Sequence, residues 1–324
     1  MTPFPVQRRS LEEWIASRSG EVKGATMHSY VAGVRSYQVD LGLPVPDDVF
    51  HHPRLRRIID GARNIFGEAP RRDRYPLTRD ILVRILSFPL ISLDGPLDYL
   101  DVDAHLEARA LRASFTLAFA AFLRIGEFTY SPLALADWSR QSSRLLTRQA
   151  VTISSTGDAL CLVLPQSKTD PSRKGVTLVV ARSDPGDIAC PVQAMVDYFA
   201  STAHFALPGS PLFFRTNASH TKLLPWTRAY VLRRLALCLE QAGIDARGFS
   251  GHSFRRGAAT TAAHNNLGGY EIQLLGRWKS DAYKAYIDTP PAQLHALSRR
   301  LQGHFDPLSP LPPLPSHMPP PARY

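Results

Sequence analysis

The segment from Ser250 to Gly257 reads SGHSFRRG and contains two side chains that are well suited to bind an anion. His252 and Arg255 are spaced i, i+3, so on a helix they lie on one face with the imidazole beside the guanidinium. The free N–H groups at the start of such a helix also attract anions. A single His and Arg on a helix are more often structural, but this arrangement suits a phosphate.

Two further segments carry cations in positions where chemistry is possible. Arg124 stands at the end of an apolar stretch, and Glu127, three residues on, can orient its guanidinium. Lys168, in the sequence SKTD, lies between two predicted strands and could reach a phosphate as a point charge or proton donor. Taken alone, each residue has a simpler interpretation. Arg124 would be an arginine at a helix end whose guanidinium reaches water, and Lys168 would be a solvated lysine at a hairpin tip.

The segment from Leu275 to Ile287 reads LGRWKSDAYKAYI and supplies two tyrosines, Tyr283 and Tyr286. Each is either a core aromatic or a covalent nucleophile, a role that the tyrosine hydroxyl can fill. Singly, each of the four segments favours the structural interpretation. The ordered set of Arg, Lys, His-x-x-Arg, Gly-x-Trp and Tyr favours the chemical one.

In that order and spacing, the four segments resemble the tyrosine recombinase, or phage integrase, family. The resemblance covers roughly residues 10–300 and is strongest over 111–128 and 249–288. The sequences of three motifs are most similar to those of recombinases from eukaryotic mobile elements of the DIRS and Crypton kind. These motifs are SKTD, GHSFRRGAAT and GRWKSDAYKAYI. The resemblance implies a site-specific enzyme that cleaves and rejoins DNA through a 3′-phosphotyrosyl link, with no metal and no cofactor.

The resemblance also implies a role for each matching residue. Arg124 and Arg255 would clamp the nonbridging oxygens of the phosphate, and His252 would assist proton transfer or hydrogen-bond the phosphate. Lys168 would protonate the leaving 5′-oxygen, with Lys174 as the alternative. The remaining roles are Tyr286 as nucleophile rather than Tyr283, Trp278 in the position usually held by histidine with Arg277 as a close second, and Glu127 as a support for the site.

The pattern of apolar residues predicts a mainly α protein with a small antiparallel β-sheet, that is, an α+β fold. Expected helices cover 26–41, 51–66, 106–123, 191–199, 227–241 and 253–265, with two more beginning at Ser10 and Thr78, each capped by its hydroxyl. Expected strands are 151–153, 159–164 and 176–180.

We expect the chain to divide into an N-terminal extension (1–9), a helical core-binding domain (10–90), a linker (91–105), a catalytic domain (106–305) and a proline-rich tail (306–324). By resemblance, the two domains would form a C-shaped clamp around duplex DNA. Residues 291–305 would pack on a neighbouring subunit, or would form a helix that closes the core of the same subunit.

Arginines are frequent in the first helical region, and we expect some of them to contact phosphates rather than only to solvate a face. The chain carries 38 basic and 28 acidic residues, a net charge of +10, which favours a polyanionic partner such as nucleic acid. The residues predicted to bind nucleic acid are Arg54, Arg56, Arg57, Arg71, Arg72, Arg74 and Arg256.

Other features of the composition exclude several classes of protein. Cys161, Cys190 and Cys238 are too far apart for a zinc finger or a disulfide framework. No apolar run is long enough to span a membrane, and the N-terminus lacks the apolar core of a signal peptide. We expect no membrane partner, and by resemblance a nuclear location and dimers or synaptic tetramers on double-stranded DNA.

Three other functions remain open from the sequence. A recombinase fold that has lost its activity would be a DNA-binding protein. A type IB topoisomerase would use the same chemistry to relax supercoils without needing specific sites. A basic helical protein with coincidental motifs is the third alternative, and the ordered set of four segments argues against it.

Overall fold

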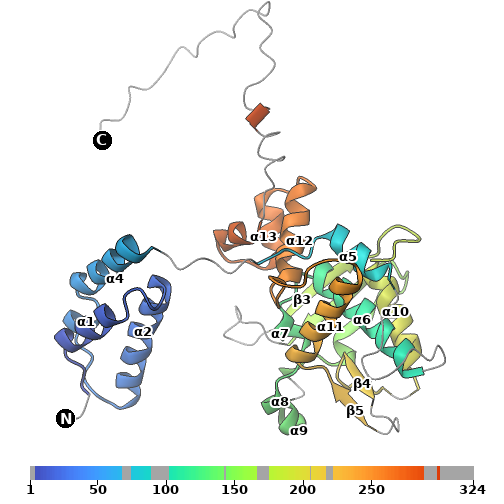
Figure 1. The fold of residues 1–324 in the computed structure, drawn as a ribbon. Helices are drawn as coiled ribbons and strands as arrows, with labels where there is room; N and C mark the ends of the chain where they lie inside the picture. Colours follow the sequence, from blue (N-terminus) through green and yellow to red (C-terminus); the bar gives the residue numbers. More distant parts are fainter. Residues whose placement is uncertain are drawn as a thin grey trace, which may run out of the picture. The chain divides into compact units, whose positions relative to one another are not determined.

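The structure is a computed structural model that describes residues 4–67, 74–88, 102–141, 144–165, 175–204, 206–216, 222–287 and 298–299. The chain divides into two compact units, an N-terminal unit (Met1–Asp73) and a C-terminal unit (Arg74–Tyr324). Both are mainly helical, and the only sheets within the described residues lie in the C-terminal unit (Figure 1). The expected tail and residues 300–305 lie outside the described part.

The N-terminal unit is a small helical bundle around its own apolar core. Leu11, Ile15, Met27, Leu55 and Ile59 are buried together there. The first helix begins at Arg8 with Gln7 at its N-cap, so the prediction that Ser10 caps it is wrong. The helices of this unit are α1 (Arg8–Ser17), α2 (Gly24–Asp40), α3 (Asp47–Phe50) and α4 (Pro53–Phe66).

Helix α5 (Arg79–Leu86), which we expected in the first domain, packs into the C-terminal unit. Its apolar face, with Leu82, Ile85 and Leu86, is buried in the large core of that unit. The segment before the helix is also held to this unit, since Leu77 donates its N–H to the carbonyl of Ser253 at 2.9 Å. Thr78 occupies the N-cap as predicted, but its hydroxyl makes no capping hydrogen bond.

The C-terminal unit is built around α6 (Val102–Ala120), which packs against α10 (Pro191–Thr202) and α12 (Ser253–His264) (Figure 1). Helix α6 is apolar on most sides, as its buried Leu111, Phe115 and Leu117 show, and such a helix needs partners all around it. It starts four residues before the predicted Leu106, inside the segment that we had assigned to the linker. The other long helices of the unit are α11 (Arg228–Gln241) and α13 (Gly269–Gly276).

A three-stranded antiparallel sheet lies in this unit in the order β1-β2-β3. Its strands are β1 (Val151–Ile153), β2 (Ala159–Leu164) and β3 (Val176–Ala181), so the predicted sheet is confirmed. Lys168 and Lys174 belong to the connection between β2 and β3 and lie outside the described residues. A second hairpin, β4 (Phe214–Thr216) with β5 (Leu223–Pro225), was not predicted.

The shorter elements connect these parts. They are α7 (Ile125–Phe128), α8 (Pro132–Ala136), α9 (Trp138–Gln141), η2 (Arg148–Ala150) and η3 (Asp281–Tyr286). The predicted fold class, mainly α with a small antiparallel sheet, is confirmed. In the part of the chain that the structure describes, no helix has the length and apolar character to cross a membrane.

Candidate active site

The loop before α12 brings together the ends of several elements of the C-terminal unit. Ile125, at the start of α7, donates its N–H to the carbonyl of Gly251 at 3.3 Å. The approach is so close that a Cβ on Gly251 would lie 2.3 Å from the side chain of Ile125. Only glycine permits this contact, and it sets His252 beside the turn that carries Arg124.

Arg124 and Glu127 form a compact pair at the N-terminus of α7. The carboxylate of Glu127 accepts the backbone N–H of Arg124 and a guanidinium N–H of the same residue, both at 2.9 Å. The two side chains are 18% and 6% exposed. Glu127 therefore both caps the helix and orients Arg124.

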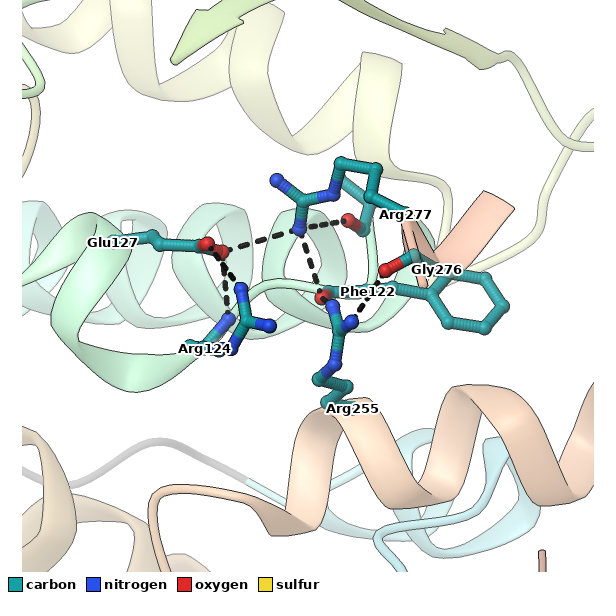
Figure 2. A network of polar contacts seen from close by, with 7 residues as sticks. Phe122, Arg124, Glu127, Arg255, Gly276 and Arg277 are labelled. Carbon is teal, nitrogen blue, oxygen red and sulfur yellow. Dashed lines mark hydrogen bonds and ion pairs between the residues drawn. The ribbon is translucent and has the colours of Figure 1, made fainter. Parts of the chain in front are cut away.

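Arg277 approaches the same carboxylate from α13. It ends that helix in the left-handed conformation, with φ of 58°, and turns its side chain inward. Its Nη2 donates to Glu127 Oε2 at 3.1 Å and to the carbonyl of Phe122 at 3.1 Å (Figure 2). Its Nε and Nη1 are buried without a hydrogen-bond partner among the described residues.

Arg255 lies inside the unit, in the first turn of α12, with none of its surface exposed. Its Nη1 donates to the carbonyl of Phe122 at 2.7 Å and its Nη2 donates to the carbonyl of Gly276 (Figure 2). The Nε is buried with no partner in the described part of the chain. Both terminal nitrogens thus point at the chain ends of α6 and α13.

We call Arg124, Arg255, Arg277 and Glu127 the arginine cluster: three guanidiniums around one carboxylate. Burial raises the pKa of Glu127, but Arg277 and Arg124 outweigh it and hold that pKa below its usual value. Burial, with repulsion from Arg124 and Arg277, lowers the pKa of Arg255 to about 9, so the guanidinium remains protonated at neutral pH. The cluster carries excess buried positive charge, which favours the binding of an anion.

Trp278 covers Arg255. The guanidinium carbon of Arg255 lies 3.9 Å from the indole ring centroid, a cation–π distance. The ring also lies on Gly276, where a Cβ would come within 1.5 Å of it, so the residue before Arg277 must be glycine.

Tyr286 lies next to this indole. Its ring centroid is 5.3 Å from that of Trp278 and 6.3 Å from that of His252. Tyr286 is half-buried, whereas Tyr283 is only 8% exposed and packs with Ala258, Ala259 and Ile272. The segment of Tyr286 is held to α12, since Arg256 donates to the carbonyl of Ala285 at 3.0 Å.

His252 faces four positive groups. Burial lowers its pKa, and Arg74, Arg228, Arg124 and Arg255 lower it further, so the imidazole is neutral at neutral pH. Arg228, at the start of α11, was not among the predicted site residues. It follows Thr227, which caps α11 by accepting the N–H of Tyr230, and no local pattern in the sequence connects it with His252.

The structure brings nine of the predicted residues together within the C-terminal unit. Arg54 and Arg56 lie in the N-terminal unit, where each pairs with a carboxylate, and Arg57 is exposed on the same helix. Lys168, Lys174, Arg71 and Arg72 lie outside the described residues. The predicted residues gathered in the C-terminal unit are Arg74, Arg124, Glu127, His252, Arg255, Arg256, Arg277, Trp278 and Tyr286.

Of the two candidates for the histidine position, Trp278 is the one that contacts Tyr286, and Arg277 binds Glu127. In the described residues, no group of three His, Cys, Asp or Glu side chains comes close enough to hold a metal ion.

Comparisons with known proteins find similarity in structure only. No family model matches the sequence, and a search of curated proteins also finds no match. The Tn1549 transposon integrase in complex with transposon right end DNA has a TM-score of 0.53 at 12% identity, covering 92% of this chain and 86% of the other. The same integrase with circular intermediate DNA has a TM-score of 0.51 at 13% identity, over 92% and 86%.

A third structure, the XerH site-specific recombinase in a post-cleavage complex with palindromic difH substrate, has a TM-score of 0.52 at 12% identity. It covers 92% of this chain and 70% of the other. At such low identity these similarities show the fold alone. The fold is the one seen in tyrosine recombinases, as the order of motifs led us to expect.

Proposed function

We propose that the chain is a tyrosine recombinase that breaks and rejoins DNA strands, with Tyr286 as the nucleophile. One observation carries the proposal: Tyr286 lies between His252 and Trp278, directly beside the buried arginine cluster. A hydroxyl nucleophile, a titratable imidazole and several guanidiniums are the groups that attack on a phosphodiester requires.

In the proposed reaction the hydroxyl oxygen of Tyr286 forms a bond to phosphorus, and the bond from phosphorus to the 5′-oxygen breaks. The tyrosine proton is taken up by a base, for which the neutral His252 is suited. The leaving 5′-oxygen takes a proton from an acid, a role that we propose for Lys168. The reverse attack by a 5′-hydroxyl restores the DNA backbone and frees the tyrosine.

The arginine cluster would stabilise the charge that develops on the nonbridging oxygens. Arg124 lies closest to the surface, while Arg255 keeps N–H donors, its Nε among them, that the two backbone carbonyls do not occupy. The excess buried positive charge favours a phosphate there, because an anion relieves the repulsion among the three guanidiniums. Trp278 would keep water from the face of Arg255.

The test is covalent trapping on a nicked duplex, in which the cleaved strand cannot be rejoined because a short piece diffuses away. The substrates are duplexes that carry the sequences flanking the gene of this chain. We expect wild-type protein to form a protein–DNA adduct that survives SDS, and Tyr286→Phe to form none. Tyr283→Phe is the matched control, and it should still form the adduct because Tyr283 lies in the packed core.

A second function is favoured by the state of Arg255. Both of its terminal nitrogens already donate to backbone carbonyls, and the side chain is fully buried. If that arrangement persists on DNA, the protein binds duplex DNA without cleaving it. Tight binding of a duplex that wild-type protein never joins covalently, on any of the flanking sequences, would favour this alternative.

We further propose that the chain acts on double-stranded DNA as a dimer or tetramer, in the integration or excision of a eukaryotic mobile element in the nucleus. Supporting this are the motifs SKTD, GHSFRRGAAT and GRWKSDAYKAYI. The structurally similar Tn1549 integrase is, by its description, the integrase of a transposon and was solved in complex with DNA. The measurement is the oligomeric state on duplexes that carry one or two target sites.

A further inference from the structure

Three segments that are far apart in the sequence meet around the loop before α12. Tyr75 donates its N–H to the carbonyl of Gly248 at 3.2 Å, and its ring lies 5.8 Å from that of Phe249. Arg228 reaches the same loop from α11, because a Cβ on Gly251 would lie 3.5 Å from its Nη2. The two contacts bring Arg74 and Arg228 close enough to His252 to act on its charge. We call these two residues the rim of the site.

Neither rim arginine has a carboxylate partner among the described residues. Arg74 and Arg228 are exposed, and no carboxylate in the described part of the chain lies within ion-pair distance of either guanidinium. Glu127, the carboxylate of the arginine cluster, binds Arg124 and Arg277. The rim therefore presents two free cations next to a site that already holds an excess of positive charge.

We propose that Arg228, together with Arg74, binds a second backbone phosphate of the substrate DNA, next to the phosphate at His252. The inference rests on the proposed function, because it assigns the rim to the same DNA strand that the active site would cleave. An exposed guanidinium offers a fork of N–H donors that matches a phosphate group. Contacts of this kind fix the register of the DNA and carry no sequence information.

The electrostatics of the rim support this assignment. In the free protein the two rim cations repel a proton from His252. A phosphate between them and the imidazole neutralises that repulsion. The rim would thus be occupied whenever DNA is bound, and binding would raise the pKa of His252 toward its ordinary value.

The experiment measures the affinity of the full-length protein for a duplex of fixed sequence as a function of salt. Each phosphate contact contributes about 0.9 to the slope of log K against log salt. Because the two arginines share one phosphate, we expect the double variant Arg74→Gln/Arg228→Gln to reduce the steepness of that slope by about 0.9, and each single variant to reduce it by part of that amount. The matched control is Arg233→Gln, an exposed arginine five residues further along α11 that does not act on His252.

Arg228→Lys should keep most of the slope, because the charge remains. A slope for Arg228→Gln equal to that of Arg233→Gln would overturn the proposal. The covalent trapping assay on wild-type protein separates the two proposals. An adduct with an unchanged slope refutes only the rim contact. A reduced slope with no adduct keeps the rim contact and counts against the proposed chemistry.

Discussion

Arginines occur in two very different settings in the two units. In the C-terminal unit, Arg255 is fully buried and the side chain of Arg277 is only 10% exposed. In the N-terminal unit, the side chains of Arg54 and Arg56 are 65% and 82% exposed. The first group packs three positive charges around one carboxylate, and the second group stands in water.

The physical cost of the two settings is opposite. Buried guanidiniums lose hydration and repel one another, so their arrangement lowers stability unless an anion arrives. Exposed arginines cost almost nothing and gain almost nothing from their partners. Under the proposed function, the C-terminal cluster binds one specific phosphate, whereas the arginines of α4 contribute diffuse attraction to a polyanion.

The largest effect that separates the two regions concerns the rate of cleavage. We expect His252→Ala to slow covalent adduct formation by about 10²- to 10⁴-fold, because a positioned acid or base contributes roughly that factor. Its affinity for DNA should change far less, since the contact strengthens only as charge develops. Arg57→Gln should show its effect in the affinity. Equal losses of binding and cleavage for His252→Ala would contradict this role.

A somewhat smaller effect concerns the free energy of unfolding. It compares the loss caused by Glu127→Gln with the loss caused by Asp60→Asn. Glu127 is the carboxylate of the arginine cluster, and its removal leaves buried guanidiniums uncompensated at a cost of about 3–5 kcal/mol. Asp60 pairs with the exposed Arg56 and Arg63, at 3.7 and 3.8 Å, and its loss should cost about 0–1 kcal/mol. Urea unfolding of each variant measures both. Equal costs would mean that burial does not distinguish the two regions.

The smallest effect is a pH dependence. It concerns the difference in the free energy of unfolding between wild type and Glu127→Gln. The pKa of Glu127 is held below its ordinary value of 4.5 in the folded protein. The stability that its carboxylate contributes is therefore fully present above the pKa of the unfolded chain, and it is lost as the pH falls through the lowered value. Unfolding of wild type and Glu127→Gln should differ by a constant amount near neutral pH and converge in acid. A gap that widens in acid would contradict the assigned direction.

Most of the fold could be predicted from the sequence because it depends on local patterns. The strands at 151–153 and 159–164 are β-branched or apolar runs between turn residues, and the structure has them at those positions. The boundary after the first helices could not be predicted. Helix α5 has an apolar face like those of its predecessors, and only the tertiary contacts of Leu77 and Leu82 assign it to the C-terminal unit.

The site shows the same division. Arg124 with Glu127 and His252 with Arg255 are local spacings, so the sequence identifies them. The side chain of Arg277 turns inward because its own backbone is left-handed at the end of α13. It also donates to the carbonyl of Phe122, which lies 155 residues away. Arg228 was missed for a similar reason, since an arginine in the first turn of a helix has no local sign of a distant histidine.

The most direct test of the account is to identify the residue that carries the DNA. The trapped adduct is digested with nuclease and protease, and the peptide that retains a phosphonucleotide is sequenced by mass spectrometry. The account predicts the modification on Tyr286, and on no other side chain, in wild-type protein. A nucleotide on Tyr283 or on any other residue would contradict it.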